Sequence, residues 1–207
     1  MTRPSRSEAS RLSLVCAIAT IAIGVTVLTG WTLHIDALTR LLVGNVHMLP
    51  ITAATFVIAG VSLLMQRVDR AAPSTWSLVS RGLALLVLVI GLVTLAERMW
   101  GWDIGLDALL FRAVLARMPY QPVGLMATNS AVSFVFVGAA LFLLDGQTRR
   151  IRQIAHWFST LGIAIAALAL IGYLYGATAL YQMDATAAMA VSTACALFIL
   201  CVGILSA

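Results

Sequence analysis

The stretch Gly101-Trp-Asp-Ile-Gly-Leu-Asp-Ala-Leu109 decides the fold, because Gly30-Trp-Thr-Leu-His-Ile-Asp-Ala-Leu38 has already stated its pattern once. Glycine, tryptophan, aspartate, alanine and leucine recur at matching places in the two copies. Each copy follows one apolar run and precedes another, so both mark the turn of a membrane hairpin. We expect the glycine to end the outward helix and the tryptophan to anchor it at the membrane interface.

The composition excludes a soluble domain. Hydrophobic residues make up 61% of the 207 residues and charged residues 10%, whereas about 25% of a soluble domain is charged. The mean hydropathy is +1.01. All 13 basic residues are arginines in short segments between apolar runs. The net charge of +5 is therefore interpreted as setting membrane orientation, and no nucleic-acid partner is expected.

Six apolar runs are long enough to cross a bilayer core of about 30 Å. Backbone polar groups in lipid must be satisfied internally, so these runs are expected to be helices. They cover residues 12–30, 49–65, 82–96, 126–144, 157–175 and 189–206, and the third gains length if it extends to Trp100. The predicted fold class is all-α: a polytopic membrane protein with six transmembrane helices as three repeated hairpins, about 12–66, 82–144 and 157–206.

The arginines predict the orientation of the bundle. Nine of them lie in the N-terminal segment and in the second and fourth connections, and four lie in the other connections. This bias places the N- and C-termini in the cytoplasm. Residues 1–11 are then a cytoplasmic tail and residues 12–207 a six-helix membrane domain. Because the chain ends close to the sixth run, we also expect it to be one region of a larger protein.

The three returning runs begin alike, each with a methionine followed by small and hydroxylated residues. Aligning them on that methionine brings Thr52, Ser130 and Thr193 to one position. Small and hydroxylated residues permit close helix approach and hydrogen bonds between helices. Three glycines are expected at the helix contacts: Gly91, Gly138 and Gly162.

No catalytic motif is present in the sequence. It has no H-E-x-x-H, no phosphate-binding glycine-rich loop and no nucleophile elbow. The 3 cysteines lie in apolar runs and are interpreted as packing thiols, with no metal-ligand spacing. No histidine pair is placed to face across the bundle, so we expect neither haem nor another cofactor, and no metal.

The candidate ligand-binding residues follow the outward ends of the runs, and each has two interpretations. Glu97 either lies with Arg98 at the lipid headgroups or faces a polar cavity. Asp107 either caps a loop helix or approaches a ligand. The aromatic side chains form an interfacial belt or roof a pocket for a flat apolar ligand. The full candidate set is Trp31, Glu97, Trp102, Asp107, Asn129, Ser130 and Tyr173.

The order of these motifs resembles that of a known family. Gly101-Trp-Asp-x-Gly-x-Asp-x-Leu-Leu-Phe111, then Met126-x-x-Asn-Ser-Ala131, then Gly172-Tyr-Leu-Tyr-Gly176 resembles the membrane-integral N-terminal sensor region of bacterial sensor histidine kinases. Similar regions precede PAS or diguanylate cyclase modules. The resemblance covers nearly the whole chain.

The resemblance implies a multi-pass sensory input domain in the bacterial inner membrane, acting in a two-component system. Its implied partners are the lipid bilayer, a small apolar or external ligand, a cytoplasmic signalling output module and a second copy in a homodimer. No phosphoacceptor box or ATP-binding motif occurs in the sequence, so kinase activity is not assigned to this chain. Two alternatives stay open: a small solute transporter or channel, and a non-catalytic membrane scaffold subunit.

Overall fold

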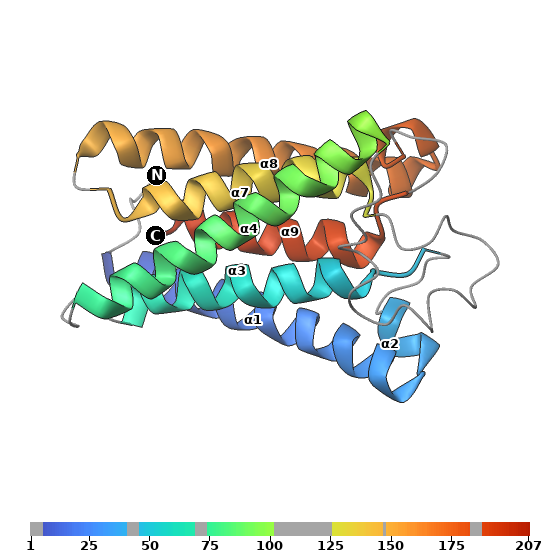
Figure 1. The fold of residues 1–207 in the computed structure, drawn as a ribbon, viewed down its shortest axis with the longest axis horizontal. Coiled ribbons are helices and arrows are strands. Elements are labelled where there is room, and N and C mark those ends of the chain that lie inside the picture. The colour runs from blue at the N-terminus through green and yellow to red at the C-terminus, as the bar shows by residue number, and fades with distance from the viewer. Residues whose placement is uncertain (1–5, 41–45, 69–73, 102–125, 147, 183–187) are drawn as a thin grey trace.

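The computed structural model describes residues 6–40, 46–68, 74–101, 126–146, 148–182 and 188–207, and within these ranges it contains helices and no strand (Figure 1). The described ranges hold seven α-helices and a short 3₁₀ helix, η1 (Thr178–Leu180). The α-helices are α1 (Arg6–Leu33), α2 (Asp36–Arg40), α3 (Pro50–Val68), α4 (Ser74–Trp100), α7 (Thr128–Leu144), α8 (Arg149–Tyr175) and α9 (Val191–Leu205).

Four of these helices, α1, α3, α4 and α8, are long and apolar enough to cross a membrane. The other two apolar helices, α7 and α9, are shorter, with 17 and 15 residues. Helix α4 extends to Trp100, as the third span required. Helix α8 begins well before the predicted residue 157, because Thr148 caps it by accepting a hydrogen bond from the Ile151 backbone N–H at 3.4 Å.

The end of α1 corrects the sequence interpretation of Gly30. The helix runs past this glycine to Leu33, and the turn falls at His34, whose φ is 58°. A Cβ at Gly30 would lie 2.7 Å from the Leu38 Cβ. Gly30 therefore permits close packing of α2 against α1, and it does not end the outward helix.

The six apolar helices run alternately in opposite directions (Figure 1), and their contacts close them into a ring. Each contacts its neighbours in the chain, and α9 returns to contact α1. Helices α3, α7 and α9 also contact one another. They form the centre of the bundle, and α1, α4 and α8 form its periphery.

The centre is filled by large apolar side chains. The rings of Phe56 and Phe134 meet edge to face with centroids 4.9 Å apart. Further fully buried residues of α3, α7 and α9 include Leu63, Leu141, Leu197, Leu200 and Ile204. In contrast, the periphery exposes many large apolar residues, among them Val15, Ile18, Leu85, Leu86, Leu92, Leu161, Leu168 and Ile171. So much exposed apolar surface fits a lipid environment.

Two glycines allow α4 and α7 to approach at backbone distance. A Cβ at Gly138 in α7 would lie 2.5 Å from the Leu88 backbone nitrogen in α4, and one at Gly91 would lie 2.9 Å from the Ala131 carbonyl oxygen. A Cβ at Gly162 in α8 would lie 2.7 Å from the Cys201 Sγ, a side-chain atom of α9. All three glycines lie at helix contacts, as the sequence predicts.

Candidate ligand-binding site at the distal end

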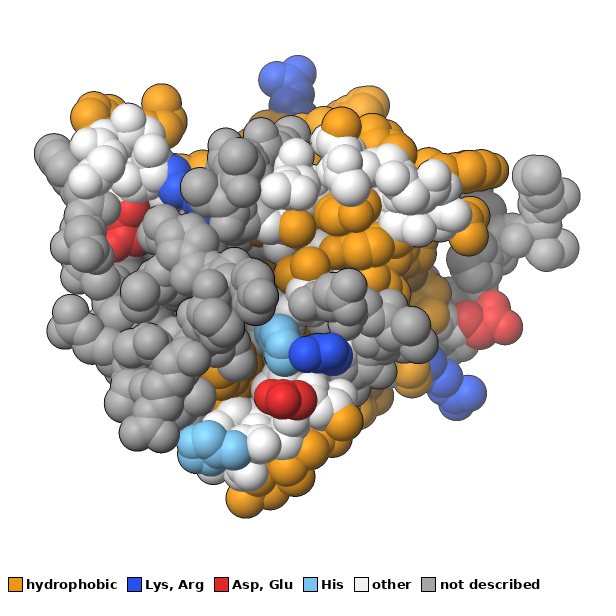
Figure 2. Space-filling model, turned by 90° about the vertical axis from the view of Figure 1, so that its right-hand side faces the viewer, with side chains coloured by type: hydrophobic (Ala, Val, Ile, Leu, Met, Phe, Trp, Pro, Cys, Tyr) orange, Lys and Arg blue, Asp and Glu red, His pale blue; other side chains and the backbone are white. Residues whose placement is uncertain are grey.

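We call the end of the bundle that holds both termini the proximal end and the opposite end the distal end. At the distal end α1, α4 and α8 finish, and α3, α7 and α9 begin (Figure 1). Figure 2 looks onto this end, where charged and histidine side chains lie among polar ones and the flanks are apolar. The candidate residues of the described chain, Trp31, Glu97, Asn129, Ser130 and Tyr173, all lie here. Trp102 and Asp107 lie outside the described residues.

Three backbone carbonyls at the starts of the central helices accept hydrogen bonds from side chains of the peripheral helices. The pairs are Trp31 Nε1 to Met48 O at 2.9 Å, Arg98 Nε to Met126 O at 2.9 Å, and Tyr173 Oη to Met189 O at 2.6 Å. The three methionines are buried and precede their helices in non-helical backbone. A buried carbonyl without a partner is costly, so these donors stabilise the starts of the central helices.

Trp31 is therefore not the interfacial anchor that the sequence suggested. Its side chain is 2% exposed, because its ring is packed inside and its N–H is used by Met48. Tyr173 is half-buried and stacks on Tyr181, with ring centroids 3.9 Å apart. Trp100 and Tyr175 are exposed, as an interfacial belt requires.

Beside Trp31, His47 joins α2 to the start of α3. Arg40 Nε donates to His47 Nε2 at 3.2 Å, so Nε2 must be the acceptor of the neutral ring. The His47 Nδ1–H then donates to Thr39 Oγ1 at 2.7 Å, and Thr39 donates on to the Asp36 carbonyl at 2.9 Å. Burial first and Arg40 second lower the pKa of His47 below its ordinary value, against a weaker opposite effect of Asp36. These surroundings favour the neutral form of the His47 imidazole.

Glu97, Asn129 and Ser130 are all deeply buried, Ser130 with 3% exposure. Glu97 is 4% exposed and Asn129 is 2% exposed. The contacts of Gly91 with Ala131 and of Arg98 with Met126 fix the antiparallel register of α4 and α7. Burial favours the interpretation in which Glu97 faces the interior, while its neighbour Arg98 binds the Met126 carbonyl.

Several buried polar atoms at this end have no hydrogen-bond partner within the described part of the chain. They are Thr94 Oγ1, Glu97 Oε2, Asn129 Oδ1 and Ser192 Oγ. Buried polar groups in proteins are almost always paired, so unpaired ones point to a functional role. Two of these atoms are pure acceptors, and they would be satisfied by a ligand that carries O–H or N–H groups.

Sequence reasoning missed some members of this cluster. Thr94 lies one helical turn before Glu97. That spacing puts the two residues on the same face of the helix, so Thr94 could have been predicted from it. Ser192 stands beside Thr193 in the first turn of α9 and is equally buried. The methionine carbonyls carry no sequence signal, because every residue has a carbonyl.

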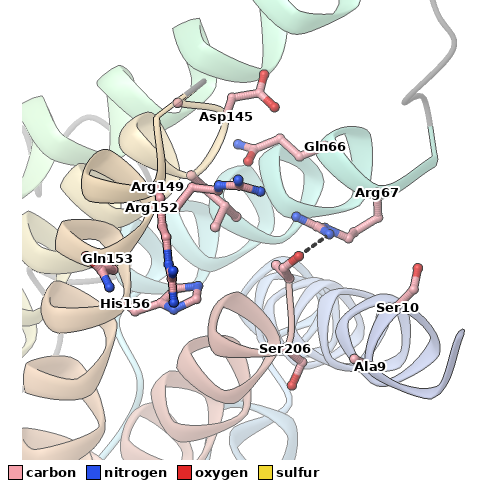
Figure 3. Close-up of a pocket in the computed structure, with 13 residues that line it drawn as sticks. Ala9, Ser10, Gln66, Arg67, Asp145, Arg149, Arg152, Gln153, His156 and Ser206 are labelled. Atoms are coloured by element: carbon pink, nitrogen blue, oxygen red, sulfur yellow. Dashed lines mark hydrogen bonds between the residues drawn. The ribbon is translucent and has the colours of Figure 1, made fainter. Parts of the chain in front are cut away.

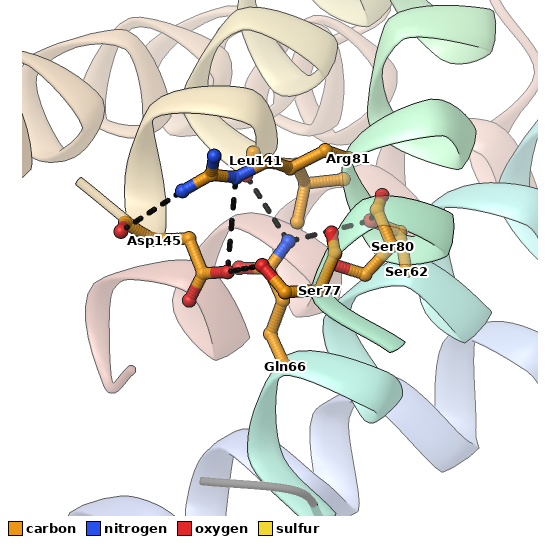
Figure 4. Close-up of polar contacts among 7 residues, drawn as sticks. All are labelled: Ser62, Gln66, Ser77, Ser80, Arg81, Leu141 and Asp145. Atoms are coloured by element: carbon orange, nitrogen blue, oxygen red, sulfur yellow. Dashed lines mark hydrogen bonds and ion pairs between the residues drawn. The ribbon is translucent and has the colours of Figure 1, made fainter. Parts of the chain in front are cut away.

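The proximal end has a different kind of polar network, which the sequence did not indicate (Figure 4). Ser77 Oγ donates to Asp145 Oδ2 at 3.0 Å, and Arg81 Nε lies 3.9 Å from the same oxygen. Gln66 Nε2 donates to the Leu141 carbonyl at 3.1 Å, and Ser62 donates to the Ser80 carbonyl at 2.9 Å. These bonds join α3, α4 and α7.

No family model, no curated protein and no solved structure matches this chain. Within the described residues no group of three His, Cys, Asp or Glu side chains could hold a metal ion. The described distal end offers buried hydrogen-bond acceptors, set among helix starts that are held by side-chain donors.

Proposed function

We propose that this chain is the membrane-embedded sensory input region of a bacterial signal-transduction protein, the N-terminal part of a sensor histidine kinase. The proposal rests on the order of motifs that resembles such regions and on the buried, unpaired acceptors at the distal end. It includes six membrane crossings, arranged as three repeated hairpins.

The two short helices are compatible with crossing a membrane. Helices of 17 and 15 residues are about 25 and 22 Å long, somewhat less than the hydrocarbon core. Both α7 and α9 lie in the centre of the bundle, where other helices shield them from lipid. Non-helical backbone at membrane depth is tolerated when it is buried in protein. The buried residues Met126 and Met189, with their bonded carbonyls, meet that condition.

A shared set of contacts supports the three-hairpin repeat. The carbonyl contact at a methionine occurs once in each pair of helices. The first and third pairs share two more contacts. Gly30 packs on Leu38 as Gly172 packs on Leu180. A Cβ added at each glycine would lie 2.7 and 2.8 Å from the Cβ of the leucine. In addition, the Met48 N–H donates to the Thr39 carbonyl at 3.2 Å. The Met189 N–H donates to the Tyr181 carbonyl in the same way, at 2.9 Å.

The arginines support an orientation with the proximal end in the cytoplasm. Arg11, Arg67, Arg81, Arg149, Arg150 and Arg152 belong to helix turns at that end. Arg40 and Arg98 are the arginines of the described chain at the distal end. Under the positive-inside rule, this orientation has the distal site at the outer face of the inner membrane.

The observation that carries the sensory proposal is the unpaired state of Glu97 Oε2 and Asn129 Oδ1 beside the start of α7. A ligand that donates hydrogen bonds to them favours one packing of α4 against α7. The ligand can shift the equilibrium between the two packings only by as much as its affinities for them differ. Because α7 contacts α9, the sixth helix can carry the change to a cytoplasmic module of a homodimer. The filled centre disfavours the alternative of a channel or transporter.

The experiment fuses the chain, through Ala207, to the catalytic core of a reporter histidine kinase and inserts residues at the junction. Two or five inserted helical residues rotate the kinase core about the helix axis by about 200° or 140°. Seven residues return it to within about 20° of its original orientation. We expect autophosphorylation to change with two and five residues and to recover with seven. Output that ignores all three insertions contradicts the proposal. Solute flux in proteoliposomes would instead favour transport.

A further inference from the structure

A cavity of about 820 Å³ opens at the proximal end, on the side opposite to the distal site. Its walls are the ends of α3, α7 and α9, the first turn of α1 and the first two turns of α8 (Figure 3). The volume lies within the range of small-molecule sites. Because its lining is mostly polar residues, the cavity differs from the apolar packing that fills the rest of the centre.

The charge of the cavity is positive. Arg67, Arg149 and Arg152 lie around it, and Arg67 Nη1 already donates to the Ala207 oxygen at 2.6 Å. The acidic residue of the lining, Asp145, is already engaged by Arg81 and by the Ser77 hydroxyl. The backbone N–H groups at the start of α8 add a partial positive charge at the same place. These groups select an anion, and the guanidinium geometry suits phosphate oxygens.

Gln66 gives an independent indication of a ligand. Its side chain is 8% exposed and lines the cavity. Its Nε2 donates to the Leu141 carbonyl, which fixes the orientation of the amide. The Oε1 atom is buried and has no hydrogen-bond partner within the described residues. An acceptor left unpaired among cations calls for a ligand that carries a hydroxyl group as well as a negative charge.

Exposed tryptophans locate the cavity with respect to a bilayer. Trp76 in the first turn of α4 and Trp157 in α8 are 49% and 70% exposed, and both lie at the proximal end. Tryptophan at this position marks the level of the lipid headgroups. Basic cavities between membrane helices on the cytoplasmic side are suited to anionic headgroups.

We propose that this cavity binds a phosphate ester that carries a hydroxyl group, as in the phosphoglycerol headgroup of an anionic lipid. Arg149 and Arg152 hold the phosphate oxygens, and Gln66 Oε1 accepts a hydrogen bond from the hydroxyl group. The site is separate from the distal cluster, and it does not depend on the sensory role proposed above.

The test measures retention of phosphatidylglycerol by the purified 207-residue protein in nanodiscs of phosphatidylcholine, using native mass spectrometry. The variant R149Q/R152Q should bind the lipid roughly twenty-five-fold more weakly, from about fivefold for each arginine. The matched control is R150Q, because Arg150 is an exposed neighbour on the same helix that does not line the cavity. It should bind within about twofold of the parent protein. Q66L should weaken phosphatidylglycerol but not phosphatidic acid, whose headgroup lacks the hydroxyl-bearing glycerol.

A second arm separates the two sources of the phosphate ester. Glycerol 3-phosphate is added to the protein in phosphatidylcholine nanodiscs, and the thermal midpoint is measured. Stabilisation by the lipid alone assigns the site to a headgroup, whereas stabilisation by glycerol 3-phosphate that is lost in R149Q/R152Q assigns it to a soluble phosphate ester. Equal losses in R149Q/R152Q and R150Q, or no binding in either arm, overturn the proposal.

Discussion

The two ends of the bundle are both polar, but for different physical reasons. At the proximal end the carboxylate of Asp145 accepts a hydrogen bond from Ser77 and pairs with Arg81. At the distal end Glu97 is more deeply buried, and its Oε2 has no hydrogen-bond partner in the described chain. A paired carboxylate contributes to stability, whereas a buried unpaired one costs free energy. The Asp145 carboxylate is thus paired within the fold, whereas the Glu97 oxygen is one of the acceptors that the proposed distal ligand would engage.

The largest effect should come from removing one tryptophan at each end. W31A removes a buried ring and leaves the Met48 carbonyl without its donor, so it should lower the free energy of unfolding by about 3–5 kcal/mol. W157A removes a ring that is 70% exposed and should cost less than about 0.5 kcal/mol. Denaturation in detergent micelles, followed by circular dichroism, measures both values. Similar losses would contradict the burial of Trp31.

The next effect concerns the contact of α4 with α7, which connects the two ends. G138A should lower stability by about 1–3 kcal/mol, because the new Cβ meets the Leu88 backbone at 2.5 Å. G82A is the matched control, since nothing lies within 4 Å of a Cβ there. It should raise stability by about 0.5–1 kcal/mol through its helix propensity. Thermal midpoints of the two variants should therefore move in opposite directions.

A carboxylate-to-amide change at each end tests the comparison directly. D145N weakens the bonds from Ser77 and Arg81 and should lower stability by about 1 kcal/mol, since the site is partly exposed. E97Q replaces a buried acidic group that has an unpaired oxygen and should raise stability by about 1 kcal/mol. Chemical denaturation of the two variants, side by side, gives the two signs. A loss in E97Q as large as that in D145N would show that Glu97 is already paired.

The smallest effect is a pH dependence at the distal end. The pKa of His47 is lowered from 6.5, so this imidazole binds a proton less readily in the folded protein than in the unfolded chain. Its contribution to stability is present above pH 6.5 and is lost as the pH falls through the folded pKa. The ring of Trp31 lies 6.4 Å from that of His47. A fluorine label on Trp31 should therefore titrate by NMR with a midpoint below 6.5, and H47Q should abolish the titration.

The helices could be predicted from the sequence because each long apolar run has one stable form in a bilayer. The extension of α4 to Trp100 followed from the same length requirement. The start of α8 could not be read in this way, because arginine and glutamine continue a helix as well as leucine does. Thr148 was the available signal, since threonine is a favourable N-cap.

The site was predictable in part. An ionisable residue in an apolar run marked Glu97, and a polar pair at a helix start marked Asn129. The matching of Trp31 with Trp102 did not reveal the contact at Met126, because Arg98, one helical turn earlier, makes it. An indole, a guanidinium and a phenol share only their ability to donate a hydrogen bond. Aligning the repeats by residue identity does not detect this shared property. The proximal cavity is formed by chain segments that are distant in sequence and has no local pattern.

The contact between α1 and α9 has a consequence for the synthesis of the protein. A Cβ at Gly203 would lie 2.7 Å from the Cys16 Cβ, so the first and sixth long helices meet at close range. Such contacts between distant parts of a chain form late and slow the folding. Until α9 emerges from the ribosome, the face of α1 that carries Ser13 and Cys16 must face lipid or a chaperone. A substitution that disrupts α9 should therefore leave this face of α1 uncovered and increase proteolysis.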